Sequence, residues 1–100
     1  MSISPATVVG IAWYRAESYP RITALMADGA SFPKSYDSWR QKAVRMEREF
    51  ARRGSLTTRV DVDPAAFEVW CRSRNLPPDS AARGRFVDES VAAESAGPAS

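Results

Sequence analysis

The sequence predicts a small α+β domain in which two short paired strands are covered by four helices, in the order βααβαα. Two β-favouring runs, residues 8–14 and 56–62, are each followed by two helix-start signals. In both cases a Gly or Asn stop and a proline turn separate the two helices. Because a chain of 100 residues is long enough for one modest core, we expect a single domain over residues 8–91.

The order of these signals recurs, which divides the domain into pseudo-repeat halves, residues 8–54 and 55–91. Neither half is expected to close a core alone. An ancient duplication and a coincidence of common helix punctuation explain the recurrence equally well. Residues 1–7 are interpreted as an N-terminal extension, and the small polar residues 92–100 predict a flexible tail.

The first strand, residues 8–14, is apolar on both faces, as expected for a strand covered by helices. Gly10 indicates either a bulge or a close packing contact within it. The next helix begins near Tyr19 and Pro20, since proline is tolerated in the first turn of a helix. We expect Gly29 to end this segment in a left-handed conformation.

The second helix carries the clearest periodic pattern in the chain. Ser35 is its predicted N-cap, and Gly54 its predicted stop. Large or apolar residues recur between them at steps of three and four, which predicts one buried seam along the helix. The residues of the seam are Tyr36, Trp39, Ala43, Met46 and Phe50.

The second half begins with an alternating strand, residues 56–62. Asp63 followed by Pro64 is a strong start signal for the third helix, because aspartate caps helices and proline suits their first position. Asn75 is the predicted stop. Asp79 is the predicted N-cap of the fourth helix.

Two short strands are not stable alone in water. We therefore expect them to pair beneath the helices, or to complete a larger sheet across a dimer. A helical crossover permits a parallel pair, but the sequence leaves the direction open. The chain also carries more large apolar side chains than a two-stranded sheet easily hides, which favours an interaction surface.

The chain has no histidine and one cysteine, Cys71. This composition excludes zinc fingers, Cys-His nucleophiles and Ser-His-Asp triads. The glycines show no phosphate-loop spacing. We therefore expect a protein that is not an enzyme and needs no cofactor or metal. An enzyme reading would require a polar pocket that gathers Tyr14, Arg15, Glu17 or Asp61 with strongly shifted pKa values.

Positive charge is concentrated in the middle of the chain, where residues 34–59 hold eight basic and three acidic side chains. Such a segment fits either a stripe that contacts nucleic acid or a solvated helix face. Glu47 and Glu49 interrupt the stripe and favour the second interpretation. The candidate interaction residues of this segment are Arg45, Arg48, Arg52 and Arg59.

Arg15 is a further candidate interaction residue, because it follows two aromatic residues at the end of a strand and arginine is common in interface hot spots. The function predicted from these observations is a non-enzymatic module that binds a protein partner or a second copy of itself. One alternative is a nucleic-acid-binding protein that uses the basic segment 40–59. Another is a small inhibitor of phage or mobile-element origin.

The apolar run 8–14 is too short to span a membrane or to form a signal peptide. A single cysteine suits a reducing compartment. We therefore expect a cytoplasmic protein without a membrane partner.

Two strings in the sequence resemble those of short bacterial proteins of unknown function from GC-rich genomes. The resemblance covers residues 11 to 88 and rests on core aromatics and structural punctuation. It implies a bacterial, cytoplasmic origin and transfers no activity, cofactor or catalytic residue. The strings are Trp13-Tyr14-Arg15 with Tyr19-Pro20, and Val62-Asp63-Pro64 with Phe67 and Trp70-Cys71.

Overall fold

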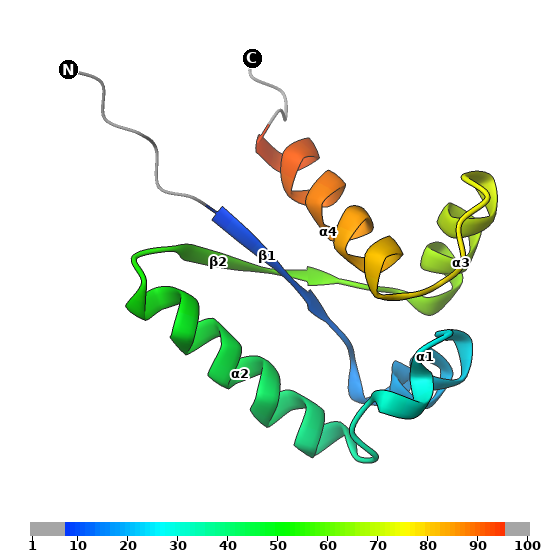
Figure 1. Ribbon diagram of the computed structural model, residues 1–100, viewed down its shortest axis with the longest axis horizontal. Helices are drawn as coiled ribbons and strands as arrows, with labels where there is room; N and C mark the ends of the chain where they lie inside the picture. The colour runs from blue at the N-terminus through cyan, green and yellow to red at the C-terminus, as the bar shows by residue number, and fades with distance from the viewer. Residues whose placement is uncertain (1–7, 96–100) are drawn as a thin grey trace.

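The structure, a computed structural model, describes residues 8–95 and has the predicted α+β fold (Figure 1). Two short 3-10 turns, Ala16–Ser18 and Gly29–Ser31, flank the first helix. The predicted N-terminal extension, residues 1–7, and residues 96–100 of the predicted tail lie outside the described residues. The main elements are β1 (Val8–Trp13), α1 (Tyr19–Leu25), α2 (Tyr36–Arg52), β2 (Leu56–Asp61), α3 (Pro64–Ser73) and α4 (Ser80–Ser95).

The two strands form a parallel pair, which answers the question of direction that the sequence left open. Val8 lies opposite Leu56, and the register continues without interruption to Trp13 opposite Asp61. The segment α1–α2 forms the crossover that a parallel pair requires. Figure 1 shows α4 on one side of the sheet and α2 on the other.

Gly10 makes the close contact that was one of its two predicted roles. A Cβ atom at this position would lie 2.4 Å from Cγ1 of Val87 and 2.7 Å from Cγ2 of Val91, both on α4. The continuous register leaves no bulge at this residue. Glycine therefore lets α4 approach β1 closely.

The main core lies beyond the carboxyl ends of the strands rather than beneath their whole length. Tyr14 and Val62, each of which comes directly after a strand, are 3% and 1% exposed. They pack with buried side chains of α1, α3 and α4. The other members of this cluster are Tyr19, Ile22, Met26, Phe67, Cys71 and Ala82.

The predicted caps are confirmed. In each case a side-chain oxygen accepts a hydrogen bond from the backbone N–H three residues later, which satisfies a group that the helix itself leaves without a partner. The bonds run from Ser38 N to Ser35 Oγ (3.0 Å), from Ala66 N to Asp63 Oδ2 (2.9 Å) and from Ala82 N to Asp79 Oδ1 (3.0 Å).

Two of the three predicted helix stops are confirmed. Gly54 has φ 86° and Asn75 has φ 58°, both in the left-handed region. The prediction for Gly29 is wrong, since α1 ends at Leu25 and the chain leaves it in an extended conformation. Gly29 lies in a 3-10 turn, where a Cβ atom would sit 1.9 Å from the carbonyl oxygen of Thr23.

The prediction of one buried seam along α2 holds only in part and is wrong for Met46. Of its five residues only Ala43 is buried, and Met46 is 50% exposed. The remaining members, Tyr36, Trp39 and Phe50, are half-buried. A sheet of two strands is too narrow to cover the whole apolar stripe of a long helix, so part of that stripe stays open to solvent.

The last helix extends beyond the predicted domain boundary at residue 91. α4 continues for four more residues, to Ser95.

Candidate functional site

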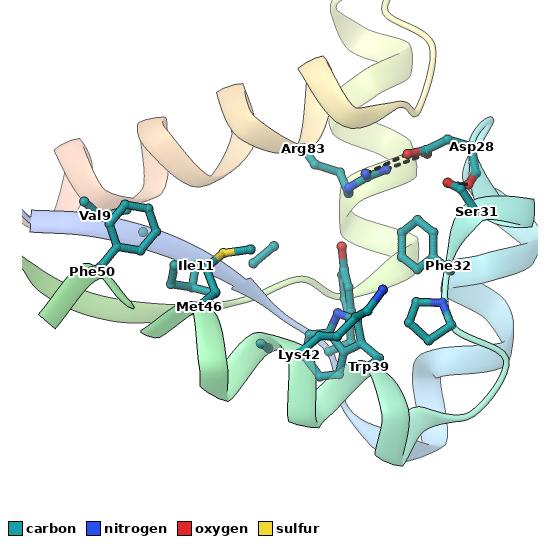
Figure 2. Close-up of a pocket in the computed structure, with 15 residues that line it drawn as sticks. Val9, Ile11, Asp28, Ser31, Phe32, Trp39, Lys42, Met46, Phe50 and Arg83 are labelled. Atoms are coloured by element: carbon teal, nitrogen blue, oxygen red, sulfur yellow. Dashed lines mark hydrogen bonds and ion pairs between the residues drawn. The ribbon is translucent and has the colours of Figure 1, made fainter. Parts of the chain in front are cut away.

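A groove of about 430 Å³ runs along β1 and is bounded by α2 (Figure 2). Residues 9–12 of β1 line one side. The loop after α1 and Arg83 of α4 close one end. The side chains from α2 are Trp39, Lys42, Ala43, Met46 and Phe50.

The groove includes the free edge of β1. The Trp13 carbonyl accepts a hydrogen bond from the Val62 N–H at 2.9 Å, so the backbone groups of Trp13 point toward β2. Because successive residues of a strand direct these groups to opposite sides, Gly10 and Ala12 present their N–H and C=O groups to the other edge. The sheet formed by residues 8–95 has two strands, so this edge has no strand partner within it.

A tyrosine hydroxyl closes one end of this edge. Tyr36 on α2 donates a hydrogen bond to the Tyr14 carbonyl at 2.9 Å. The carbonyl that would extend the free edge beyond Ala12 is therefore already engaged. The available edge consists of the segment from Val8 to Ala12.

One end of the groove is apolar. Figure 2 shows Met46 and Phe50 of α2 beside Val9 and Ile11 of β1. Ile11 is buried and forms the floor, whereas Met46 is half exposed. Val8, at the start of the strand, is 44% exposed. Apolar side chains thus flank the open main chain.

The other end of the groove contains an ion pair. The two terminal guanidinium nitrogens of Arg83, Nη1 and Nη2, donate to the Asp28 carboxylate at 2.7 and 2.8 Å. These hydrogen bonds hold the pKa of Asp28 below its ordinary value. The Arg83 guanidinium also lies 4.9 Å from the centre of the Phe32 ring. The pair joins the loop after α1 to α4 and leaves no net charge on this wall.

Lys42 is the third charged residue that lines the groove. In Figure 2 its ammonium end extends toward the part of the groove where Phe32 lies. Within residues 8–95 no carboxylate forms an ion pair with it. The groove therefore carries one uncompensated positive charge.

Comparison of the chain with protein-family models, with curated proteins and with solved structures finds no match.

The polar pocket required for an enzyme reading is not assembled by the residues considered for it. Tyr14 lines the groove, and burial raises its pKa to about 12, so its phenol stays protonated at neutral pH. Arg15 and Asp61 instead form an exposed ion pair at 3.3 Å. Neither of them nor Glu17 lines the groove.

The five candidate arginines do not form one patch. Arg59 donates two hydrogen bonds to Glu47, at 2.8 and 3.0 Å, and stacks 3.7 Å from the centre of the Trp13 ring. These hydrogen bonds also lower the pKa of Glu47. Arg15 is engaged with Asp61, as described above.

The other three candidate arginines, Arg45, Arg48 and Arg52, lie on the exposed side of α2. Arg52 pairs with Glu49 one turn away. Arg45 and Arg48 make no ion pair with any described residue. The basic stripe of the helix is thus partly neutralised and partly available.

Sequence reasoning identified the α2 seam but not its partner residues in the groove. Lys42, Phe32 and Arg83 come from three separate regions of the chain, and no local spacing links them. The useful signal was the surplus of large apolar residues over what two strands can cover.

Three further observations concern metal ligands, the cysteine and membrane-spanning helices in the described residues. No group of three potential metal ligands occurs among residues 8–95. Cys71 is buried, and this burial raises the pKa of its thiol, which disfavours the reactive thiolate. None of the helices in this part of the chain is both long enough and apolar enough to cross a membrane.

Proposed function

We propose that the protein is a non-enzymatic module that binds a polypeptide, either a partner protein or a second copy of the chain, along the β1 groove. The observation that carries this proposal is the free edge of β1 beside the exposed apolar side chains of α2. An open strand edge is a template for pairing with another chain. Apolar side chains next to it add the buried area that main-chain hydrogen bonds alone do not provide.

The composition of the groove supports a polypeptide rather than a reaction. Its polar side chains are an ion pair that is already formed, a protonated tyrosine, one lysine, the indole of Trp39, and Ser31, whose hydroxyl donates to the Asp28 carbonyl. The remaining wall is apolar and includes Phe32, Met46 and Phe50, which belong to the aromatic and methionine types enriched in the cores of protein interfaces. A reducing cytoplasmic setting is part of this proposal and is supported by the single cysteine.

Affinity capture from the host lysate, with and without nuclease, tests the proposal. Met46→Gln places an amide in the groove, and Val69→Gln makes a comparable change on α3, where Val69 is 62% exposed and does not line the groove. We expect the wild type and Val69→Gln to capture a partner protein that is retained after nuclease treatment. Met46→Gln should capture the same protein only weakly. Equal capture by all three would contradict the proposal for a partner protein.

The second-copy form of the proposal has its own measurement. Sedimentation at increasing protein concentration should show a dimer for the wild type and Val69→Gln and a weaker one for Met46→Gln. A strictly monomeric chain at high concentration removes the second copy as the occupant and leaves the partner protein.

A second candidate function, nucleic-acid binding, is favoured by one specific observation: Arg45 and Arg48 are exposed and make no ion pair with the described residues. It requires binding that weakens steeply with salt. Replacing Arg45, Arg48 or Arg52 by Ala should each lower the salt slope by about one. Absent or salt-independent binding would contradict it.

A further inference from the structure

We propose that the occupant of the groove is an extended acidic segment of another protein, which adds to β1 as a third strand and places a carboxylate at Lys42. This inference rests on the proposed function and specifies the partner. It combines the direction of the backbone groups of β1, the apolar wall from α2 and the uncompensated charge of the groove.

The free edge favours an extended segment over a helix. Gly10 and Ala12 direct their N–H and C=O groups outward, two residues apart, which is the spacing that a neighbouring strand matches. A helix satisfies its main-chain groups internally and offers none along its side. The bond from Tyr36 to the Tyr14 carbonyl ends this edge after Ala12. The paired part of the segment therefore faces residues 8–12.

The apolar end of the groove determines the kind of side chain expected on one face of the bound segment. Val9 and Ile11 point to the α2 side of the sheet, because the alternating residue Gly10 faces α4. A side chain of the added strand on that same side lies against Met46 and Phe50. Apolar residues at alternate positions of the segment would bury these half-exposed side chains.

Lys42 determines which charge the bound segment should carry. Among the charged residues that line the groove, Asp28 and Arg83 neutralise each other, so the net charge comes from Lys42. The acidic residues of α2 do not compensate it: Glu47 is bonded to Arg59, Glu49 is bonded to Arg52, and Asp37 makes no ion pair with Lys42. A carboxylate of the segment next to Lys42 would complete a charge-assisted pair.

The same charge argues against a second copy as the occupant. If β1 paired with its own copy in an antiparallel manner, a twofold axis normal to the sheet would place both α2 helices on one face. Because antiparallel pairing would place the Lys42 end of one groove beside the apolar start of the other β1, each Lys42 would meet no unpaired groove carboxylate of the second copy. Burying a charge without a partner is unfavourable. A segment with an acidic residue supplies that partner.

Selection from a display library of random short peptides against the full chain tests the inference. We expect enriched peptides with apolar residues at alternate positions and an acidic residue at one end. Lys42→Glu should weaken their binding by about tenfold and shift the selected charge from acidic to basic. Arg48→Glu makes the same change of charge on the outer face of α2, outside the groove, and should have little effect.

N-methylation of the selected peptide tests the added strand separately. Methyl groups on the alternate amides that face β1 should abolish binding, whereas methyl groups on the other amides should be tolerated. Equal loss for both sets, or for neither, overturns strand addition.

Each remaining outcome also has a definite meaning. Groove-dependent peptides that lack acidic residues, or that bind Lys42→Glu as well as the wild type, overturn this inference and leave the proposed function standing. If no selected peptide depends on Met46 or Lys42 and the free chain does not self-associate, the proposed function fails as well. A concentrated chain that dimerises through β1 identifies the second copy as the occupant and overturns the acidic segment.

Discussion

Gly10 and Gly84 are chemically identical but occupy opposite environments. A Cβ atom on Gly10 would overlap Val87 and Val91, whereas a Cβ atom on Gly84 would meet nothing within 4 Å. Gly84 lies inside α4, where glycine lowers helix stability. One glycine is therefore required by packing, and the other lowers the stability of its helix.

We expect Gly84→Ala to raise the free energy of unfolding by about 1 kcal/mol, because alanine is the better helix former and has a smaller entropy in the unfolded chain. Gly10→Ala should lower it by about 1–3 kcal/mol through overpacking against α4. Urea unfolding of both variants measures the two changes. Stabilisation by Gly10→Ala would show that α4 does not approach β1 as closely as described.

The ion pair between Asp28 and Arg83 is one of three that join the two halves within the described residues, and its arginine is the least exposed of the three. The Arg83 side chain is 15% exposed and that of Asp28 is 33% exposed, so the pair is only partly solvated. A backbone hydrogen bond from Ala27 to the Pro78 carbonyl, 2.7 Å, accompanies it. Together these bonds attach the loop after α1 to the start of α4.

Asp28→Asn should reduce the free energy of unfolding at neutral pH by about 1–2 kcal/mol, because a charged partner of Arg83 is lost. Since the folded-state pKa of Asp28 is lowered, its contribution is complete above the ordinary aspartate pKa of about 4 and is lost as the pH falls through the folded-state value. The stability difference between wild type and variant should therefore shrink in acid. Urea titrations at several pH values check this.

A double-mutant cycle with Arg83→Gln separates the pair from other effects. If the pair stabilises the fold, Arg83→Gln should lower the free energy of unfolding much less in the Asp28→Asn variant than in the wild type. Fully additive losses, or a difference that persists at low pH, would contradict the role given to the pair.

At the scale of elements, β1 and α2 together explain the groove. The apolar stripe of α2 was predicted from its period, and its exposed part follows from the width of the sheet. α4 packs mainly on β1, on the opposite face, so it does not cover the side where α2 and β1 diverge. The length of the groove thus follows from β1 and α2 and from the absence of a third strand beside β1 within residues 8–95.

The two edges of β1 should be distinguishable by amide hydrogen exchange. The N–H groups of Ile11 and Trp13 point to β2 and should exchange slowly, whereas those of Gly10 and Ala12 point to the groove and should exchange faster. A bound segment should slow the second pair selectively. Uniform protection along β1 in the free, monomeric chain would mean that the edge is already covered.

At the scale of the molecule, the core joins the two predicted halves. Tyr14, Tyr19 and Ile22 come from the first half, and Phe67 and Ala82 from the second. The strand pair is also shared between them. Each half supplies one strand and two helices, as the recurring sequence signals predicted.

Neither half should therefore fold alone. Chains that end at residue 54 or begin at residue 55 are expected to give the circular dichroism of largely unfolded polypeptides, since each loses its strand partner and most of its core contacts. The full chain under the same conditions is the control. Cooperative unfolding of either isolated half would contradict the shared core.

Local features were predictable from the sequence because their energetics are local. The Ser35, Asp63 and Asp79 caps each bond to a backbone group three residues away. The left-handed stops at Gly54 and Asn75 follow from backbone sterics at single residues. Gly29 was assigned wrongly because a helix stop and a steric contact with Thr23 favour the same residue.

The sequence by itself determined the order of strands and helices, their caps and the α+β class, because turn chemistry and periodicity act over a few neighbouring residues. Only the tertiary structure decided that the strands are parallel, that Met46 stays exposed and that Lys42 lies in the groove with the pair of Asp28 and Arg83. These outcomes depend on which surfaces meet after the crossover, and segments far apart in the chain contribute to each of them. How much of a periodic apolar stripe is buried depends on the width of the surface against which it packs. The spacing of residues within the stripe contains no information on that width.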